Sequence, residues 1–344
     1  MSDPVPALFV ERCGPLVTVQ DAGRFGYQRF GVTPAGPMDP WAFRLANRLL
    51  GQSEREAGLE LGPGGLVLRV EAERVRLAFA GAERPIELDG RPLPWWSVTN
   101  LVRGQRLAIG PARGAVWSYL AIAGGLALPP VMGSRATHTL TRLGGLEGRP
   151  LRAGDRLPLA DPLAGADMPE LVLAEPPFPP AGPIRVLLGP QEAWFGPAAI
   201  ATFLDAAWRI SARSDRMGYR LEGPRIEHAR SPNIVSDGIV MGSVQVPGSG
   251  QPIVLVADRQ STGGYPKIAT VIGADIGRLA QVPAGGTVRF RAVGFEEALA
   301  ARAEARARLE ATPSRLVPLA SGGRLDAGFL LSVNLVSGVT AGEP

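Results

Sequence analysis

Hydrophobic and polar residues alternate over short stretches of this chain, and turn residues interrupt the alternation again and again. Between residues 59 and 158, segments such as Val75–Phe79 repeat with a period of two, which is typical of strands with one buried face. Turn signals recur about every 8 to 12 residues, the spacing expected of a β-sandwich or β-barrel. Further strands are expected at residues 8–19, 184–188, 239–246, 253–257 and 287–293. The pattern therefore predicts a mostly β protein.

Three segments carry helix signals instead. Asp39 is a good N-cap residue, Pro40 follows at the first helical position, and apolar residues recur at helical spacing until Gly51. Residues 197–207 predict a second helix, and residues 295–309, which are rich in Ala, Glu and Arg, predict a third. The fold class we expect is mostly β with some α.

The chain also divides by composition. A length of 344 residues exceeds what one hydrophobic core usually supports, and a proline run at 176–183 cannot join a sheet ladder. We predict an N-terminal half (1–160), a Pro-rich linker (161–183), a C-terminal half (184–295), and a helix with a tail (296–344). The tail mixes glycine with apolar residues, including 329–333, and is suited to docking on the protein or on a partner.

Charge and cysteine content remove several classes of function. The net charge is only +4 and no run of five Lys or Arg occurs, so no nucleic-acid partner is expected. Cys13 is the only cysteine, which excludes an internal disulfide and a cysteine-based metal site. The first residues do not resemble a secretory signal, and no apolar run reaches 18 residues. No membrane partner is expected, and the cytoplasm is the expected location.

The stretch from Pro252 to Gln281 carries the strongest chemical signal. A short apolar strand ends at Asp258, and a polar, glycine-rich loop runs on to Lys267. Gly263 and Gly264 are expected to take positive φ or to let a ligand approach the backbone. Lys267 is the only lysine among 36 Lys and Arg residues. It suits a point charge that holds phosphate or carboxylate, although compositional bias toward arginine would also explain a lone lysine.

Two other loops carry similar groups. Residues 20–27 are expected to form an exposed, charged loop, and residues 214–224 repeat its order of Asp, Arg, Gly and Tyr. The repeat hints at two related halves, and chance explains it nearly as well. The glycine-dense region 133–155 is expected either to wrap around something or to form tight β-turns. Within it, His138 lacks a second ligand at metal spacing and is expected to be an ordinary packed or surface residue.

Familiar catalytic motifs are missing. The sequence contains no Walker A loop, no G-x-G-x-x-G after a strand, no G-x-S-x-G and no zinc-binding His pair. The remaining carboxylates, arginines, hydroxyls and single lysine suit the binding and polarising of a small charged substrate. For each residue taken singly, an ion pair that fixes a turn is an equal alternative.

These segments resemble a known family. The order of Val19–Tyr27, Gly36–Asn47, Gly133–Arg135, Ser214–Gly223 and Asp258–Lys267 is similar to that of the allophanate hydrolase subunit 2 family. This family is also called the biotin-dependent carboxyltransferase family, and it includes the C subunit of 5-oxoprolinase and part of urea carboxylase. The resemblance covers about residues 19–293 and implies two cyclophilin-like β-barrel halves.

The resemblance also implies an activity and partners. The chain would be one component of an ATP-dependent 5-oxoprolinase, which opens the lactam 5-oxoproline to glutamate and acts only in a complex. The partners would be a subunit-1-type protein, similar to the B subunit of 5-oxoprolinase, and the A subunit, a lactam hydrolase. The cofactor would be ATP, alone or with Mg²⁺. Alternatives are carboxyl transfer from carboxybiotin to urea or a related amide, with biotin as cofactor, and non-enzymatic regulation of a subunit-1-type kinase inhibitor.

On the matching motifs, the candidate catalytic residues are Lys267, Asp258 and Asp215. The candidate substrate- or nucleotide-binding residues are Asp21, Arg24, Tyr27, Asn47, Ser134, Arg216, Arg259, Thr262, Gly263, Gly264 and Tyr265. No metal ligands are proposed.

Overall fold

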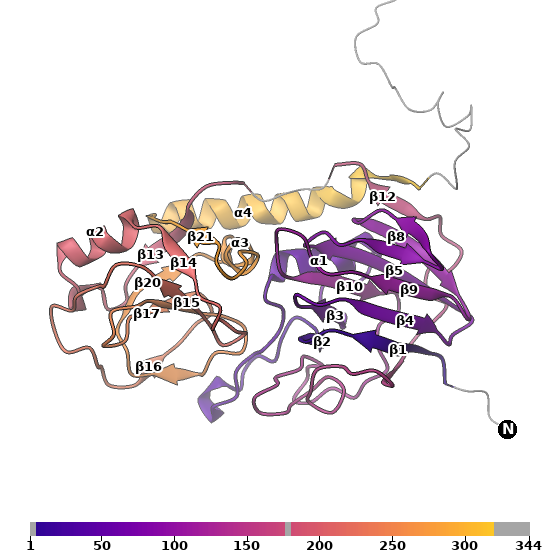
Figure 1. The fold of residues 1–344 in the computed structure, drawn as a ribbon, viewed down its shortest axis with the longest axis horizontal. Helices are drawn as coiled ribbons and strands as arrows, with labels where there is room; N and C mark the ends of the chain where they lie inside the picture. Colours follow the sequence, from indigo (N-terminus) through magenta and orange to yellow (C-terminus); the bar gives the residue numbers. More distant parts are fainter. Residues whose placement is uncertain (1–4, 176–179, 320–344) are drawn as a thin grey trace, which may run out of the picture.

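Two β-rich halves lie side by side, and one long helix runs across both of them (Figure 1). The computed structural model describes residues 5–175 and 180–319. The mostly β prediction is confirmed, since strands supply far more of the chain than helices do.

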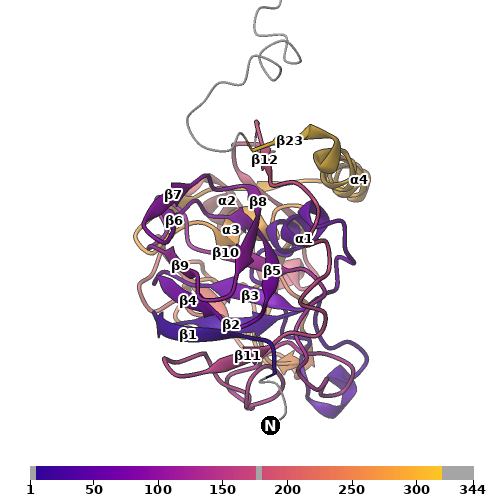
Figure 2. The same ribbon diagram turned by 90° about the vertical axis from the view of Figure 1, so that its right-hand side faces the viewer.

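The N-terminal half contains two sheets that share a hydrophobic core. Figure 2 views this half from its outer end. The first sheet has the order β11-β1-β4-β9-β6-β7, with strands Arg156–Pro158, Ala7–Cys13, Leu66–Val70, Arg106–Ile109, Ile86–Leu88 and Arg91–Leu93. The second has the order β2-β3-β10-β5-β8-β12-β23, with strands Val17–Gln20, Gly58–Leu61, Ser118–Ile122, Arg74–Gly81, Ser97–Val102, Leu171–Leu173 and Leu316–Pro318.

The C-terminal half is built on one eight-stranded sheet with the order β21-β14-β15-β18-β17-β20-β13-β22. Its strands are Thr287–Val288, Trp208–Ile210, Gly218–Glu222, Ile253–Leu255, Ser243–Gln245, Lys267–Val271, Ile184–Leu188 and Phe290–Ala292. A short ladder of β16 (Asp237–Gly238) and β19 (Thr262–Gly263) lies apart from it. The strand expected at 239–246 begins only at Ser243, because residues 239–242 form a turn after β16.

The helices match their sequence signals closely. Helix α1 (Pro40–Leu49) begins at the Asp39 cap, whose Oδ1 accepts hydrogen bonds from the N–H groups of Trp41 and Ala42. The others are α2 (Pro197–Asp205), α3 (Ile276–Ala280) and α4 (Phe295–Ala311), with short 3₁₀ turns η1 (Gln28–Phe30), η2 (Glu192–Trp194) and η3 (Thr312–Arg315).

The predicted linker and the predicted tail each contribute one strand to a sheet of the N-terminal half. Strand β12, inside the predicted linker 161–183, pairs with β8. Strand β23, just after η3, then pairs with the other edge of β12. The apolar segment 329–333 lies outside the described residues.

Helix α4 connects the two halves. The indole Nε1 of Trp41 on α1 donates to the carbonyl of Ala305 at 3.2 Å, and Arg306 pairs with Glu54 at 3.0 Å. The other end of α4 packs against β13 of the C-terminal half. Its hydrophobic residues do not form a stripe, and few of them are buried, so its position depends on these contacts at both ends.

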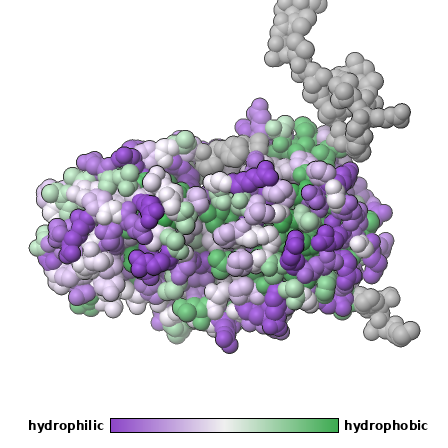
Figure 3. Space-filling view, viewed as in Figure 1, coloured by the Kyte–Doolittle hydropathy of each residue, from purple (hydrophilic) through white to green (hydrophobic). Residues whose placement is uncertain are grey.

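None of the described helices combines the length and apolar character needed to cross a bilayer. Figure 3 shows hydrophilic residues spread over the visible face, with smaller hydrophobic patches among them.

Candidate functional site

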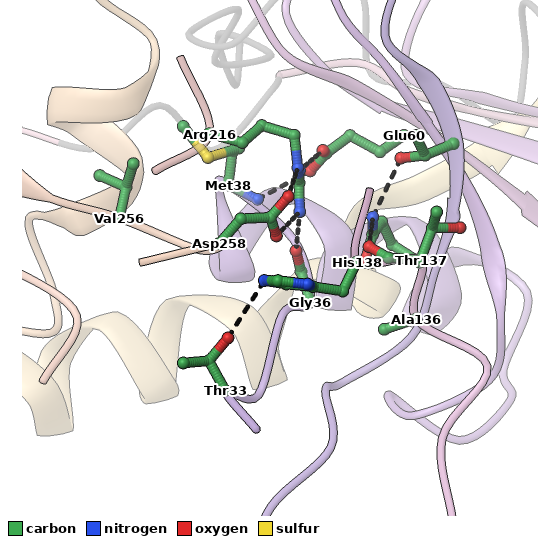
Figure 4. A network of polar contacts seen from close by, with 12 residues as sticks. Thr33, Gly36, Met38, Glu60, Ala136, Thr137, His138, Arg216, Val256 and Asp258 are labelled. Carbon is green, nitrogen blue, oxygen red and sulfur yellow. Dashed lines mark hydrogen bonds and ion pairs between the residues drawn. The ribbon is translucent and has the colours of Figure 1, made fainter. Parts of the chain in front are cut away.

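A buried arginine joins the two halves at their seam. Arg216, in the turn before β15, is 4% exposed, and its Nε and Nη2 donate to both carboxylate oxygens of Asp258 at 3.0 and 2.9 Å. Its guanidinium also donates to Glu60 on β3 and, at 2.8 Å, to the carbonyl of Gly36. Figure 4 shows Arg216 between the two carboxylates, with Gly36 on a third side. The structure thus brings together the predicted residues Arg216 and Asp258.

Glu60 completes this cluster and has no counterpart among the predicted residues. It is fully buried, and its Oε2 accepts hydrogen bonds from the N–H of Met38 at 2.7 Å and from the hydroxyl of Tyr119 at 2.8 Å. Burial raises the pKa of Glu60, while the charge of Arg216 and both hydrogen bonds oppose this rise. The sequence signal that could have revealed it is an acid between two leucines in a short apolar strand.

Electrostatics favour the charged form of Arg216. Burial alone would lower the pKa of Arg216, but Asp258 and Glu60 outweigh burial and raise the pKa above its usual value. The guanidinium donates hydrogen bonds to both acids and so lies fixed between them. The geometry therefore holds Asp258 in one orientation at the start of the 258–267 loop.

A second buried arginine organises the loops of the N-terminal half. Arg24 is 1% exposed, and its guanidinium donates to the carbonyls of Val131, Ser134 and Ala136 at 2.9, 3.3 and 3.0 Å. Asp21 accepts from the Ser134 hydroxyl at 2.6 Å and from backbone N–H groups on both loops. Burial lowers the pKa of Arg24, and the charge of Asp21 only partly opposes this.

The prediction of an exposed loop at 20–27 is therefore wrong for its charged residues. Asp21, Arg24 and Ser134 are buried and bind one another's loops, because the glycine-dense region wraps around the Arg24 guanidinium. At Gly144, which has φ +68°, a Cβ would lie 2.2 Å from the carbonyl of Ala136 and 2.7 Å from Arg24 Nη2.

Lys267, the lone lysine, is buried at the start of β20 and is already paired. Its Nζ lies 2.7 Å from Oδ2 of Asp237, which also accepts from the side chain of Gln191 at 2.9 Å. These hydrogen bonds lower the pKa of Asp237 to about 2. The ammonium of Lys267 is thus already paired with a carboxylate of the chain itself.

Of the two roles expected of the loop glycines, the positive φ is not found. Neither Gly263 nor Gly264 has a positive φ. A Cβ on Gly263 would lie 2.6 Å from the Gln245 side chain and 2.7 Å from that of Ile239. A side chain at this position would therefore have to displace the ends of the Gln245 and Ile239 side chains beside β19.

The remaining predicted residues separate into buried and exposed groups. Asn47 is fully buried, donates to the carbonyl of Glu56 at 3.1 Å and accepts from Gln52, so its side-chain amide is already paired within the chain. Asp215 accepts hydrogen bonds from the N–H groups of Met217 and Gly218 in its own turn. Tyr27 is half-buried at η1, and Thr262 and Tyr265 are exposed.

Arg259 differs from the other buried arginines because most of its donors are free. It is 6% exposed, and the only hydrogen bond that its side chain makes within the described residues runs from Nη1 to the carbonyl of Val256 at 3.2 Å. Its Nε is buried without a partner in the described part of the chain. Burial lowers the pKa of Arg259 to about 10. Such a group has donors available for an anion.

Contacts link the predicted loops into one continuous loop face. The hydroxyl of Thr33 lies 3.2 Å from Nε2 of His138, as Figure 4 shows. Across the seam, the side chain of Gln28 donates to the carbonyl of Ile239 at 3.3 Å, and the Ile239 N–H donates to Ser261 at 3.0 Å. The loop face consists of residues 20–39, 131–148, 231–241 and 258–267.

This loop face exposes seven large apolar side chains. They are Phe25, Phe30, Met132, Leu140, Val235, Val240 and Tyr265, from 37% to 91% exposed. In residues 5–175 and 180–319, no cluster of three His, Cys, Asp or Glu side chains could hold a metal ion. His138 is buried between Thr33 and Thr141, as an ordinary packed residue.

Comparison with known proteins agrees with this architecture. Residues 30–292 match the family described as "Carboxyltransferase domain, subdomain A and B". The chain belongs to this family. The C subunit of 5-oxoprolinase from Escherichia coli (strain K12) is 39% identical over 300 residues, covering 86% of this chain and 94% of that protein. Its counterpart of the same name from Haemophilus influenzae is 40% identical over 281 residues, covering 82% and 89%.

A solved structure shares the fold within a much larger molecule. The Kluyveromyces lactis urea carboxylase superposes with a TM-score of 0.82 at 28% identity, covering 92% of this chain and 30% of that one. The carboxyltransferase domain in our chain therefore occurs both as a separate protein and within a longer polypeptide.

Proposed function

We propose that this chain is the C subunit of an ATP-dependent 5-oxoprolinase and acts only together with its partner subunits. The observation that carries the proposal is the match, over 94% of its length, to a separate protein named as the C subunit of 5-oxoprolinase. Nearly the whole of that relative is therefore similar in sequence to this chain. The cytoplasm remains the expected location.

The loop face is the surface we assign to the subunit-1-type partner. Its exposed aromatic and aliphatic side chains are surrounded by polar loops, a combination that marks protein interfaces. Because the face draws loops from both halves, a partner docked there would cover the seam and enclose Arg259 and Asp258. A closed site of this kind would exclude water from the reacting groups.

In this proposal the lactam is activated and then opened. ATP transfers its γ-phosphoryl group to the amide oxygen of 5-oxoproline, leaving ADP. Water attacks the activated carbonyl carbon, the ring C–N bond breaks, and glutamate and phosphate are released. Asp258, whose orientation Arg216 fixes, would orient the water or the substrate. Arg259 is the best-placed cation for the substrate carboxylate, because its Nε is free whereas Lys267 is paired with Asp237.

Carboxyl transfer is the second candidate, since the urea carboxylase of K. lactis contains the same fold at a TM-score of 0.82. It would use the same loop face, with carboxybiotin as the donor and urea or a related amide as the acceptor.

Assays on the assembled complex separate the two candidates. The chain is co-purified with its partner subunits, and the release of ADP and glutamate from 5-oxoproline is measured beside the carboxylation of urea. We expect turnover of 5-oxoproline. Turnover of urea alone would overturn the proposal in favour of carboxyl transfer.

A variant tests the role of Arg259 in the same assay. Arg259→Met should lower kcat/KM for 5-oxoproline at least tenfold, because a buried charged hydrogen bond to the substrate is lost. Arg220→Met, an exposed arginine of the same half, is the matched control and should leave turnover unchanged. Equal activity of the two variants would remove Arg259 from the site.

A further inference from the structure

Two turns of the N-terminal half project from the loop face. One is η1, and the other is the tip of a short hairpin at residues 138–143, which a β-bridge closes. Figures 1 and 2 both place the loops that carry these turns at the same end of the molecule as β16. Phe30 in the first turn is 65% exposed, and Leu140 in the second is 67% exposed. Large apolar side chains at such positions are suited to insertion into a partner.

The hairpin is held in one conformation. The N–H of His138 donates to the carbonyl of Leu143 at 2.9 Å, and the N–H of Leu143 donates back at 3.2 Å. In the buried His138 ring, Nδ1 lies 2.6 Å from Oγ1 of Thr141, and Nε2 lies 3.2 Å from Oγ1 of Thr33. The imidazole thus ties the hairpin to the loop that carries η1. A tip held in this way loses little conformational freedom when it binds.

Arg142 takes a left-handed backbone conformation at this tip, with φ +54°. A side chain in that region costs free energy that a glycine would avoid. The chain itself does not offset this cost through polar contacts, because Arg142 is exposed and its guanidinium has no hydrogen bond or ion pair within residues 5–175 and 180–319. Backbone strain at an exposed position of this kind is typical of binding residues.

The unpaired charge on the loop face is positive. Its two exposed acids already pair with cations of the chain, Glu147 with Arg149 and Asp237 with Lys267. Arg29 and Arg142 are exposed, and neither has a carboxylate partner in the part of the chain that the structure describes. The guanidinium carbon of Arg29 instead lies 4.7 Å from the ring centroid of Phe30. Two free cations therefore stand beside two exposed apolar side chains.

This combination favours an acidic protein surface as the occupant. A second copy of the chain would bring the cations of one loop face against those of the other, and like charges disfavour such a contact. Attachment to an anionic membrane typically uses clusters of about four to eight Lys or Arg residues, whereas only Arg29 and Arg142 are exposed without a carboxylate partner here. A protein that offers both an apolar pocket and carboxylates satisfies both features of the surface.

We propose that the subunit-1-type partner presents an apolar pocket with carboxylates at its rim to this end of the loop face. Phe30 and Leu140 fill the pocket, and Arg29 and Arg142 pair with the rim. The inference rests on the proposed function, which assigns the loop face to that partner, and adds the chemistry by which the partner is recognised. A guanidinium can hold a carboxylate through two parallel hydrogen bonds, which gives the contact its geometry.

Calorimetric titration of the full-length chain with the purified subunit-1-type protein tests the inference. Arg142→Gly is the sharpest variant, because glycine relieves the backbone strain while removing the cation. Its thermal unfolding midpoint should stay the same or rise, whereas its affinity for the partner should fall about tenfold or more. A purely structural role for Arg142 would instead lower the midpoint.

Charge reversal and salt test the rim. Arg29→Glu and Arg142→Glu should each weaken binding about tenfold or more, and Phe30→Ala should weaken it as well. Raising NaCl from about 50 to about 300 mM should weaken binding of the unmodified chain more than that of either Glu variant. Arg103→Glu is the matched control, since Arg103 is exposed in a turn of the same half outside the loop face. It should bind within about twofold of the unmodified chain.

Equal partner affinity in Arg142→Gly and Arg103→Glu would overturn the inference, and so would binding that does not change with salt. Self-association of the isolated chain, or its binding to phosphatidylserine vesicles, would also overturn it if Arg142→Glu abolished that binding. A complex that opens 5-oxoproline but ignores these substitutions would remove the inference and keep the proposed function. Partner binding that needs both arginines, in a complex that turns over urea alone, would do the reverse.

Discussion

Arg24 and Arg216 begin alike in the sequence but differ in what surrounds them. Each follows an aspartate whose carboxylate accepts a hydrogen bond from the N–H two residues later, and each guanidinium is almost fully buried. Arg24 is surrounded mainly by carbonyls of its own half, whereas Arg216 faces two carboxylates from opposite halves. Carbonyl dipoles thus stabilise the buried charge of Arg24, which holds loops of one half together. Carboxylates neutralise the buried charge of Arg216, which connects the two halves.

The comparison predicts the largest loss of stability for Arg216→Met. The substitution leaves Glu60 and Asp258 buried without their counter-charge, and breaking a buried ion pair in this way costs about 3–5 kcal/mol. Urea unfolding of Arg216→Met and of a control variant measures this loss of stability. Arg209→Met is the control, since Arg209 forms an exposed pair with Glu222 and should cost less than about 1 kcal/mol. Similar losses in both variants would contradict the role given to the seam cluster.

Arg24→Met should cost less, about 2–3 kcal/mol, because it leaves neutral carbonyls without donors while Asp21 keeps its hydrogen bonds from Ser134 and two backbone N–H groups. Hydrogen exchange should also increase in residues 131–148 and remain unchanged in the C-terminal half. A loss as large as that of Arg216→Met would show that carbonyl dipoles and carboxylates do not differ in the way the comparison assumes.

The pair of Lys267 and Asp237 should contribute least to stability, because its carboxylate is half exposed although its ammonium is buried. The pKa of Asp237 is about 2 in the folded chain and about 3.9 when unfolded. Since the folded pKa is depressed, its stabilisation is present above pH of about 3.9 and is lost as pH falls toward 2. Solvent screening keeps it below about 1 kcal/mol.

Asp237→Asn checks this by removing the titrating group. Urea unfolding between pH 2 and 5 should show a shallower loss of stability with falling pH than in the unmodified chain. Identical slopes would mean that the pair contributes nothing to acid stability.

The fold followed from the sequence wherever local signals were strong. Asp39 and Pro40 marked the start of α1, and the alternation at Val75–Phe79 marked β5. The burial of Asp21 and Arg24 did not follow, because Asp and Arg side chains are usually exposed and their partners lie up to 114 residues away. Glu60 was missed for the same reason, since its partner Arg216 is 156 residues distant.

The sequence indicated which loops lie at the seam better than it indicated what their individual residues do. Arg216, Asp258 and Arg259 belong to segments that the sequence singled out, and they do lie at the seam. Roles within the loops depend on which donors are already used, as the pairing of Lys267 with Asp237 and the free Nε of Arg259 show. Such information exists only after the chain has folded.

The pairing of β23 with β12 makes the C-terminal half an insertion within the N-terminal one. As the ribosome extends the chain, the β12 edge of the second N-terminal sheet stays open until residue 318 has emerged, after every strand of the C-terminal half has been made. Newly made N-terminal halves therefore carry an unprotected strand edge, and the complete second half must emerge before the last strand can cover it.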